Sequence, residues 1–167
     1  MESHRGLTIR PTQPADVEAI WSILEQVIRG GEVFALPRDL SKADALAYWF
    51  SPAHEVFAAV ADGHILGAYY LRANYQGGGS HVANCGYMTS SAARGRGIAS
   101  AMCRHSLDRA RSRGFRAMQF NFVISSNEDA VHLWKKFGFR TVGVLPKAFS
   151  HPSFGFVDAL VMFRDLP

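Results

Sequence analysis

The chain has 167 residues, 48% of them hydrophobic and 19% charged, which is typical of a soluble globular protein and excludes a disordered or fibrous chain. A formal net charge of +4 permits binding of a polyanion, but no run of about five or six Lys or Arg residues indicates a nucleic-acid-binding tail. The two cysteines form no CxxC pair, which favours a reducing compartment and no metal site. The sequence has no apolar leader and no apolar span of about 18 residues, so we expect a cytoplasmic protein with no membrane partner and no nucleic-acid partner.

The first half of the chain predicts one strand, two helices and a hairpin. A short strand over 7–10 precedes Pro11, and apolar residues at helical spacing after Pro14 predict a helix that Gly30 and Gly31 end. Ser41 resembles the N-cap of a second helix that reaches about Phe50. Residues 55–61 and 64–73, joined by Asp62 and Gly63, are typical of a hairpin.

The second half predicts alternating strands and helices after a flexible stretch over 75–80. The expected elements are a strand over 81–89, a helix over 97–113, a strand over 116–124, a helix over 127–137 that Gly138 ends, and strands over 139–145 and 154–163. This order favours an α/β protein in which a central mixed sheet carries helices on both faces. We expect residues 1–167 to form a single domain.

The segment ARGRGIASAMC, residues 93–103, is a glycine-spaced basic turn that leads into a helix. A Walker loop is excluded because no lysine follows the glycines, and a dinucleotide-binding fingerprint fits poorly because GRGIAS ends in Ser100 after several strands. The pattern fits a pyrophosphate held by backbone N–H groups of residues 94–99 at a helix N-terminus, or a plain helix entry with solvated arginines.

Two motifs in this order resemble the GCN5-related N-acetyltransferases, the GNAT superfamily. The first is Arg94-x-x-Gly97-x-Ala99, and the second is the NEDA of residues 127–130 followed by LWKKFGF at residues 133–139. The resemblance covers nearly the whole chain and implies the GNAT fold, with acetyl-CoA as co-substrate and acetyl transfer as the reaction. The residues it implies for binding acetyl-CoA are Tyr87, Met88, Thr89, Arg94, Gly95, Arg96, Gly97, Ile98, Ala99 and Asn127. It also implies oxyanion donors among the backbone N–H groups near Tyr87 and Met88.

Asn84 and Asn121 lie on the two strands that flank the loop helix. They resemble the asparagine pair of fungal N-acetyltransferases that detoxify azetidine-2-carboxylate and related proline analogues. This resemblance implies that both residues hold a small-molecule amine acceptor, and they are the candidate catalytic pair. A buried amide needs a partner, so each asparagine contacts either a ligand or neighbouring protein groups.

Neither a general base nor a general acid is visible next to this pair. No Asp or Glu occurs in residues 82–89 or 116–124, and His81, His132 and His151 remain as relays. Trp134 stands where many members of the family carry a tyrosine that protonates the departing thiolate. Its helical spacing with other apolar residues favours a core position. We expect Cys85 to be a small buried residue rather than a nucleophile, so that the amine attacks directly in a ternary complex.

Three alternatives stay open: a domain that binds acyl-CoA as a silent sensor, an acetyltransferase that acts on a protein N-terminus, and one that acts on a lysine. A homodimer is compatible with the sequence. Residues 113–120 begin and end like the RNP1 strand of an RNA-binding domain. Ala117 stands where that motif needs a central stacking aromatic, so an RNA-binding domain is excluded.

Overall fold

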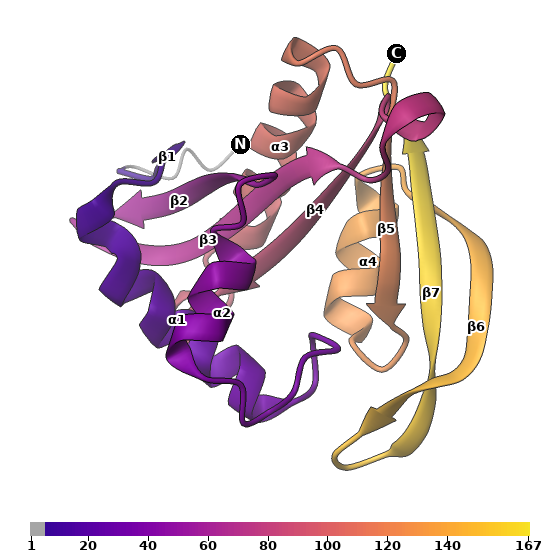
Figure 1. The fold of residues 1–167 in the computed structure, drawn as a ribbon, viewed down its shortest axis with the longest axis horizontal. Coiled ribbons are helices and arrows are strands. Elements are labelled where there is room, and N and C mark those ends of the chain that lie inside the picture. The colour runs from indigo at the N-terminus through magenta and orange to yellow at the C-terminus, as the bar shows by residue number, and fades with distance from the viewer. Residues whose placement is uncertain (1–5) are drawn as a thin grey trace.

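The computed structural model describes residues 6–167, and residues 1–5 lie outside that part. Within it, seven strands form a mixed sheet in the order β1-β2-β3-β4-β5-β7-β6 (Figure 1). The strands are β1 (Thr8–Pro11), β2 (Glu55–Ala61), β3 (His64–Ala73), β4 (Val82–Thr89), β5 (Ala117–Ile124), β6 (Arg140–His151) and β7 (Gly155–Asp165). The helices are α1 (Val17–Gly30), α2 (Lys42–Trp49), α3 (Ile98–Ser112) and α4 (Glu128–Lys136). The expected α/β class and element order are confirmed.

Local sequence signals explain where the first helices begin and end. Gly31 takes the left-handed conformation with φ 68°, and its N–H bonds to the carbonyls of the last turn of α1. The Ser41 side chain accepts a hydrogen bond from the Asp44 N–H, which caps α2 as predicted. None of the helices described here is both long enough and apolar enough to cross a membrane.

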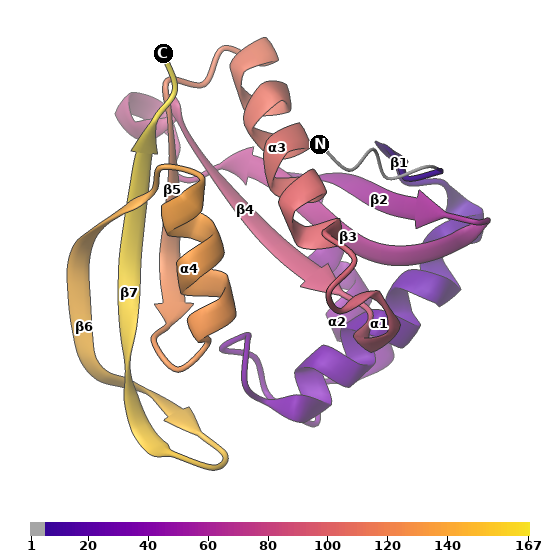
Figure 2. The same cartoon turned by 180° about the vertical axis from the view of Figure 1, so that it is seen from behind.

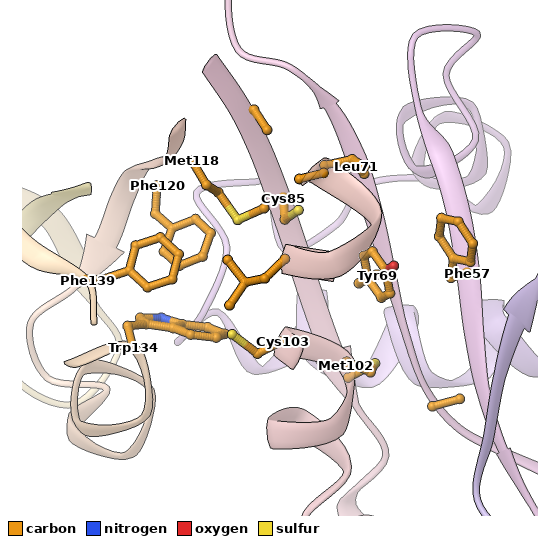
Figure 3. Close-up of a cluster of buried hydrophobic side chains, with 14 of the residues drawn as sticks. Phe57, Tyr69, Leu71, Cys85, Met102, Cys103, Met118, Phe120, Trp134 and Phe139 are labelled. Carbon is orange, nitrogen blue, oxygen red and sulfur yellow. The ribbon is translucent and has the colours of Figure 1, made fainter. Parts of the chain in front are cut away.

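The sheet separates two hydrophobic cores. Helices α1 and α2 cover one face (Figure 1), and α3 and α4 cover the other (Figure 2). The core under α3 and α4 contains Tyr69, Cys85, Met118, Phe120 and Trp134 (Figure 3). The core under α1 and α2 contains Ile20, Leu24, Trp49, Tyr70 and Met88. Since side chains alternate along a strand, the two cores identify which face each strand residue occupies.

The last hairpin is longer than the sequence predicts. Strand β6 continues to His151 because the chain resumes pairing with β7 after an irregularity between Leu145 and Phe149. Lys147 has a φ of 53°, so the backbone kinks at the point where Pro146 interrupts the strand pattern. The stretch over 75–80 contains a short 3-10 turn, Gly77–Gly79.

Strands β4 and β5 run parallel and pair only at their first residues. The pairs are Val82 with Ala117 and Ala83 with Met118, after which the two strands diverge (Figure 1). We call the diverging part, residues 84–89 of β4 and 119–124 of β5, the β4–β5 fork. Helix α3 connects the two strands, and its first turn follows the end of β4.

Candidate active site

The basic turn of residues 94–97 forms the N-terminus of α3. Gly95 and Gly97 have φ values of 75° and 70°, a region where residues with a Cβ are strained. No atom outside its neighbours lies within 4 Å of the position that a Cβ on Gly95 would take. No side chain caps the helix at Gly97, and its first turn contains no acidic residue. The first N–H groups of α3 are therefore oriented for an external anion.

Two guanidinium groups add positive charge to this turn. Arg94 and Arg96 are exposed, and the Arg96 side chain lies 3.7 Å from a carboxylate oxygen of Asp62 in the β2–β3 turn. Both side chains are solvated, and ion pairs between exposed groups contribute little to stability. Neither arginine is therefore needed to stabilise the fold. The open glycine, the uncapped helix and the two cations together fit a pyrophosphate group.

The hydrogen-bond register determines which β4 backbone groups face the fork. The Asn74 N–H donates to the Val82 carbonyl at 2.8 Å, which makes these two residues a hydrogen-bonded pair of the β3–β4 ladder. Met88 has the same parity as Val82, so its N–H and carbonyl point at β3. The residues of opposite parity direct their backbone groups toward the fork: Cys85, Tyr87 and Thr89. Of the two residues near which an oxyanion donor is expected, Tyr87 therefore directs its N–H toward the fork and Met88 directs its N–H toward β3.

Asn84 lies at the apex of the fork. It is 6% exposed and follows directly after the last residue of β4 that pairs with β5. Its Nδ2 donates to the Gln119 carbonyl at 2.9 Å, and its Oδ1 accepts from Nε of Arg72 at 3.3 Å. In a continuing parallel ladder the Gln119 carbonyl would accept from the Cys85 N–H, so the Asn84 amide takes the place of that rung where the strands separate.

Asn121 belongs to a second set of amides on the same face of the sheet. Its Nδ2 donates to Oδ1 of Asn74 at 2.7 Å, and Asn74 returns a bond to Oδ1 of Asn121 at 3.1 Å. Gln119 Nε2 donates to the same Oδ1 at 2.9 Å. We call Asn74, Asn84, Gln119 and Asn121 the amide cluster. The structure thus brings the two predicted asparagines into one cluster linked through Gln119, without a direct bond between them, and both have protein partners.

The sequence did not single out Asn74, Gln119 or Arg72. Tyr70 and Arg72 occupy alternate positions of β3, and Asn74 continues this spacing one residue beyond the end of the strand. This period was the available signal. The residues of β4 and β5 that these side chains contact could not be assigned from the sequence, because the assignment needs the register of all three strands.

An aromatic group borders the amide cluster. The Tyr70 ring lies against Gly86 of β4, because a Cβ at Gly86 would approach its Cε1, Cζ and Oη to between 2.5 and 2.7 Å. The Tyr70 hydroxyl is 3.1 Å from the hydroxyl of Tyr48, and the ring of His54 stacks on Tyr70 at 3.9 Å between centroids. Burial raises the pKa of Tyr70 well above its usual range, so its hydroxyl stays protonated.

The histidines considered as relays have structural or remote positions. His81 lines a surface cavity with Arg116 and Asp165 near the paired end of β4 and β5, and His132 is exposed on α4. His151 Nδ1 accepts the backbone N–H groups of Ser153 and Phe154, so it holds the β6–β7 turn together.

His54, which the sequence did not single out, stacks on the Tyr70 ring and lines the same cavity as Arg72. Burial lowers its pKa, and the positive charge of Arg72 adds to this, against the effect of its hydrogen bond with Trp49. Because the Trp49 carbonyl can only accept, the 3.0 Å bond assigns the ring proton to Nδ1 and leaves Nε2 as a base.

Helix α4 carries the second motif. The Asn127 side chain caps the helix, accepting from the Ala130 N–H at 3.4 Å, which leaves its Nδ2 free to donate elsewhere. Trp134 is buried 4.9 Å from the ring of Tyr87 and 4.9 Å from that of Phe120, so its predicted core role is confirmed (Figure 3). Cys85 is buried in the same core, and burial raises the pKa of its thiol. A thiol kept protonated in this way is a poor nucleophile, as expected.

Comparison with known sequences identifies the family. Residues 20–139 match the model of the Acetyltransferase (GNAT) family. The chain is 32% identical over 120 residues to N-acetyltransferase aca1 of Schizosaccharomyces pombe, a match that covers 70% of this chain and 57% of that protein. The chain therefore spans less than two thirds of the length of this curated relative.

Solved structures show the same architecture across almost the whole chain. A GCN5-related N-acetyltransferase from Kribbella flavida is 39% identical, with a TM-score of 0.94 over 98% of this chain and 100% of that one. The fold also matches yncA from Salmonella typhimurium, solved with its cofactor acetyl-CoA, at 20% identity and a TM-score of 0.83 over 96% and 94% of the two chains. The chain therefore belongs to the Acetyltransferase (GNAT) family.

Proposed function

We propose that this enzyme acetylates the amine of a small amino- or imino-acid-like acceptor by direct attack in a ternary complex. The observation that carries the proposal is the neutral amide cluster at the apex of the fork, on the α1–α2 face of the sheet. Each primary amide has two N–H groups, and the bonds within the protein use one on each of Asn84 and Asn121. The second N–H group of each is available to a carbonyl or carboxylate oxygen.

The residues proposed to hold acetyl-CoA are those of the basic turn, the β4 backbone and Asn127. When bound, acetyl-CoA supplies an activated thioester. Within residues 94–99, the N–H groups of Arg94 and Arg96 already donate to the carbonyls of Ser91 and Ala93, so those of Gly95, Gly97, Ile98 and Ala99 bind the pyrophosphate. The fork-facing N–H of Tyr87 stabilises an oxyanion. Thr89 directs its backbone groups to the same side of β4 as Tyr87, Met88 lies between these two residues, and the amide cluster orients the acceptor nitrogen.

Proton transfer in this site does not use a carboxylate of the fork strands, which contain none. The acceptor enters as the free amine or loses its proton to water at the fork. Trp134 donates only an indole N–H and has no useful acidity, so the thiolate departs without an acid at this position. A thiol of ordinary pKa near 8.5 makes such a departure feasible.

Small acceptors suit this surface better than basic protein tails. A cationic tail is normally recognised by complementary acidic groups, whereas the amide cluster is neutral and Arg72 adds a positive charge next to it. The same features fit a zwitterionic acceptor with a carboxylate. The subgroup of proline-analogue acetyltransferases, and the detoxification it implies, belong to this proposal.

An acceptor screen tests the proposal. The enzyme is incubated with acetyl-CoA and proline, azetidine-2-carboxylate, other amino acids, polyamines, or histone-like and N-terminal peptides, while free thiol is followed. We expect thiol release that depends on an amino or imino acid. Efficient turnover of peptides together with no turnover of small amino or imino acids would refute the acceptor class. Failure of every acceptor on the panel to give thiol release would refute acetyl transfer to a small amine.

The two asparagines should act as a unit. Asn84→Ala and Asn121→Ala each remove a donor that positions the acceptor, and misplacement by about 1 Å can cost roughly a hundredfold in rate. We expect the double variant to lose less free energy of catalysis than the sum of the single losses, with acetyl-CoA affinity unchanged. Full activity of both single variants on the best acceptor would make the asparagines structural.

A further inference from the structure

Arg72 carries a positive charge at the apex of the fork, and residues 6–167 supply no counter-ion to it. It lies directly opposite Asn84 in the β3–β4 register, is partly exposed, and donates from Nε to Oδ1 of Asn84 at 3.3 Å. Within residues 6–167, the ion pairs no longer than 4.0 Å do not include Arg72. A guanidinium has five N–H donors, and this one bond uses one of them.

The groups around Arg72 do not neutralise it. Tyr70 and Asn84 are neutral, and His54 has a lowered pKa that keeps its imidazole uncharged near pH 7. Glu55 shares a surface cavity of about 420 Å³ with Arg72, but its carboxylate is already bound by two other arginines. These are Arg109 at 2.5 Å and Arg113 at 2.8 Å.

The position of Arg72 connects this cavity with the amide cluster. Arg72 is one of the residues that line the cavity, and its Nε contacts Asn84 at the point where the strands separate. A small molecule bound to the guanidinium would therefore also be within reach of the Asn84 amide. An isolated cation in neutral, hydrogen-bonding surroundings is a receptor for an anion, and the planar guanidinium fits a carboxylate with two parallel bonds.

We propose that Arg72 binds the carboxylate of the acceptor and so determines that the enzyme takes amino or imino acids rather than simple amines. This inference rests on the proposed function, whose acceptor class it explains. Asn84 is held by Arg72 on one side and by the Gln119 carbonyl on the other. Binding the carboxylate on the guanidinium leaves the neighbouring amides to orient the acceptor nitrogen.

The experiment compares two acceptors that differ at one group, azetidine-2-carboxylate and its uncharged carboxamide. Wild type, Arg72→Gln and Arg72→Lys are measured with both, and Arg113→Gln is the matched control, because Arg113 lines the same cavity but is paired with Glu55. We expect Arg72→Gln to raise KM for the carboxylate about tenfold to a hundredfold. Its kcat/KM for the carboxamide should change less than about threefold, so the preference for the carboxylate disappears. Arg72→Lys should recover part of it, and Arg113→Gln should behave as wild type.

Calorimetric titration of azetidine-2-carboxylate into enzyme saturated with coenzyme A separates the two claims. No binding to wild type, together with turnover of peptides only, would overturn the proposed function and the inference with it. Binding to wild type that persists unchanged in Arg72→Gln would overturn the Arg72 assignment alone. Equal losses of Arg72→Gln on both acceptors would also overturn it, because they would show that the arginine only supports Asn84.

Discussion

Gly86 is the position at which one added methyl group should disturb the acceptor side of the fork most selectively. Its backbone lies under the Tyr70 ring, and a Cβ there would sit 2.5 Å from Cε1, 2.6 Å from Cζ and 2.7 Å from Oη. Ordinary carbon contacts are about 3.5–4.0 Å, so in Gly86→Ala the ring has to move by about 1 Å. The ring is held by the stack with His54 and the 3.1 Å contact with the Tyr48 hydroxyl.

The cost follows from these contacts. Overpacking of a core position costs about 1–3 kcal/mol, and loss of the bond between the two tyrosine hydroxyls adds about 1 kcal/mol. Replacing glycine within a strand returns about 0.5–1 kcal/mol. We expect a net loss of about 1–3 kcal/mol in the free energy of unfolding, which for a domain of this size lowers Tm by about 3–10 °C.

Denaturant unfolding of Gly86→Ala and Gly143→Ala measures this loss. Gly143 is the matched strand control, since its Cβ would lie 3.8 Å from the nearest atom, on Val161, at an ordinary contact distance. In a Tyr70→Ala background the Gly86 substitution should cost almost nothing. KM for the acceptor should rise in Gly86→Ala while acetyl-CoA affinity stays unchanged. Unaltered stability and acceptor KM would refute the claim that the Tyr70 ring lies on Gly86 at the acceptor side.

Three further substitutions test separate parts of the site. Gly97→Glu should abolish coenzyme A binding in calorimetry because it places a carboxylate at the α3 N-terminus. Gly97→Ala is the control, since it has the same backbone strain, about 1–2 kcal/mol, without the charge. Equal affinities of the two variants for coenzyme A would contradict the anion site. Cys85→Ala should keep kcat/KM within about threefold, with intersecting two-substrate initial-rate plots; parallel plots and loss of turnover would indicate a covalent intermediate instead. Burial lowers the pKa of His54 below its usual 6.5, so the unfolded chain takes up this proton at a higher pH than the folded one. The free energy of unfolding should have its full value above about pH 6.5 and fall as the pH drops through the folded pKa of His54. This fall should be less steep in His54→Gln, and identical pH slopes of the two proteins would contradict the lowered pKa of His54.

The sequence was sufficient for the order of the elements and for most of their ends. Hydrophobic spacing identified the helices, and Gly31 and Ser41 marked two of their ends by mechanisms that act within a few residues. The second part of β6 was missed because Pro146 and the positive φ of Lys147 interrupt the alternating pattern. Only pairing with β7, a contact distant in sequence, continues the strand there.

The candidate site was predictable in part for the same reason. The basic turn and the Asn127 cap are local features with a recognisable pattern, and Asn84 and Asn121 were found by resemblance. Arg72, Asn74 and Gln119 were not, because their role depends on the β3–β4–β5 register and on the end of pairing after Ala83. His54 reaches Tyr70 from the turn before β2, a contact that spacing along the chain does not indicate.

The most direct test of the account is a crystal structure of the enzyme with coenzyme A and azetidine-2-carboxylate. The account predicts the pyrophosphate at the free N–H groups of Gly95 and of residues 97–99, and the pantetheine arm between β4 and β5. It predicts the acceptor carboxylate on Arg72, with its nitrogen directed into the fork beside Asn84. Coenzyme A outside the fork, or an acceptor bound on the α3–α4 face of the sheet, would contradict it.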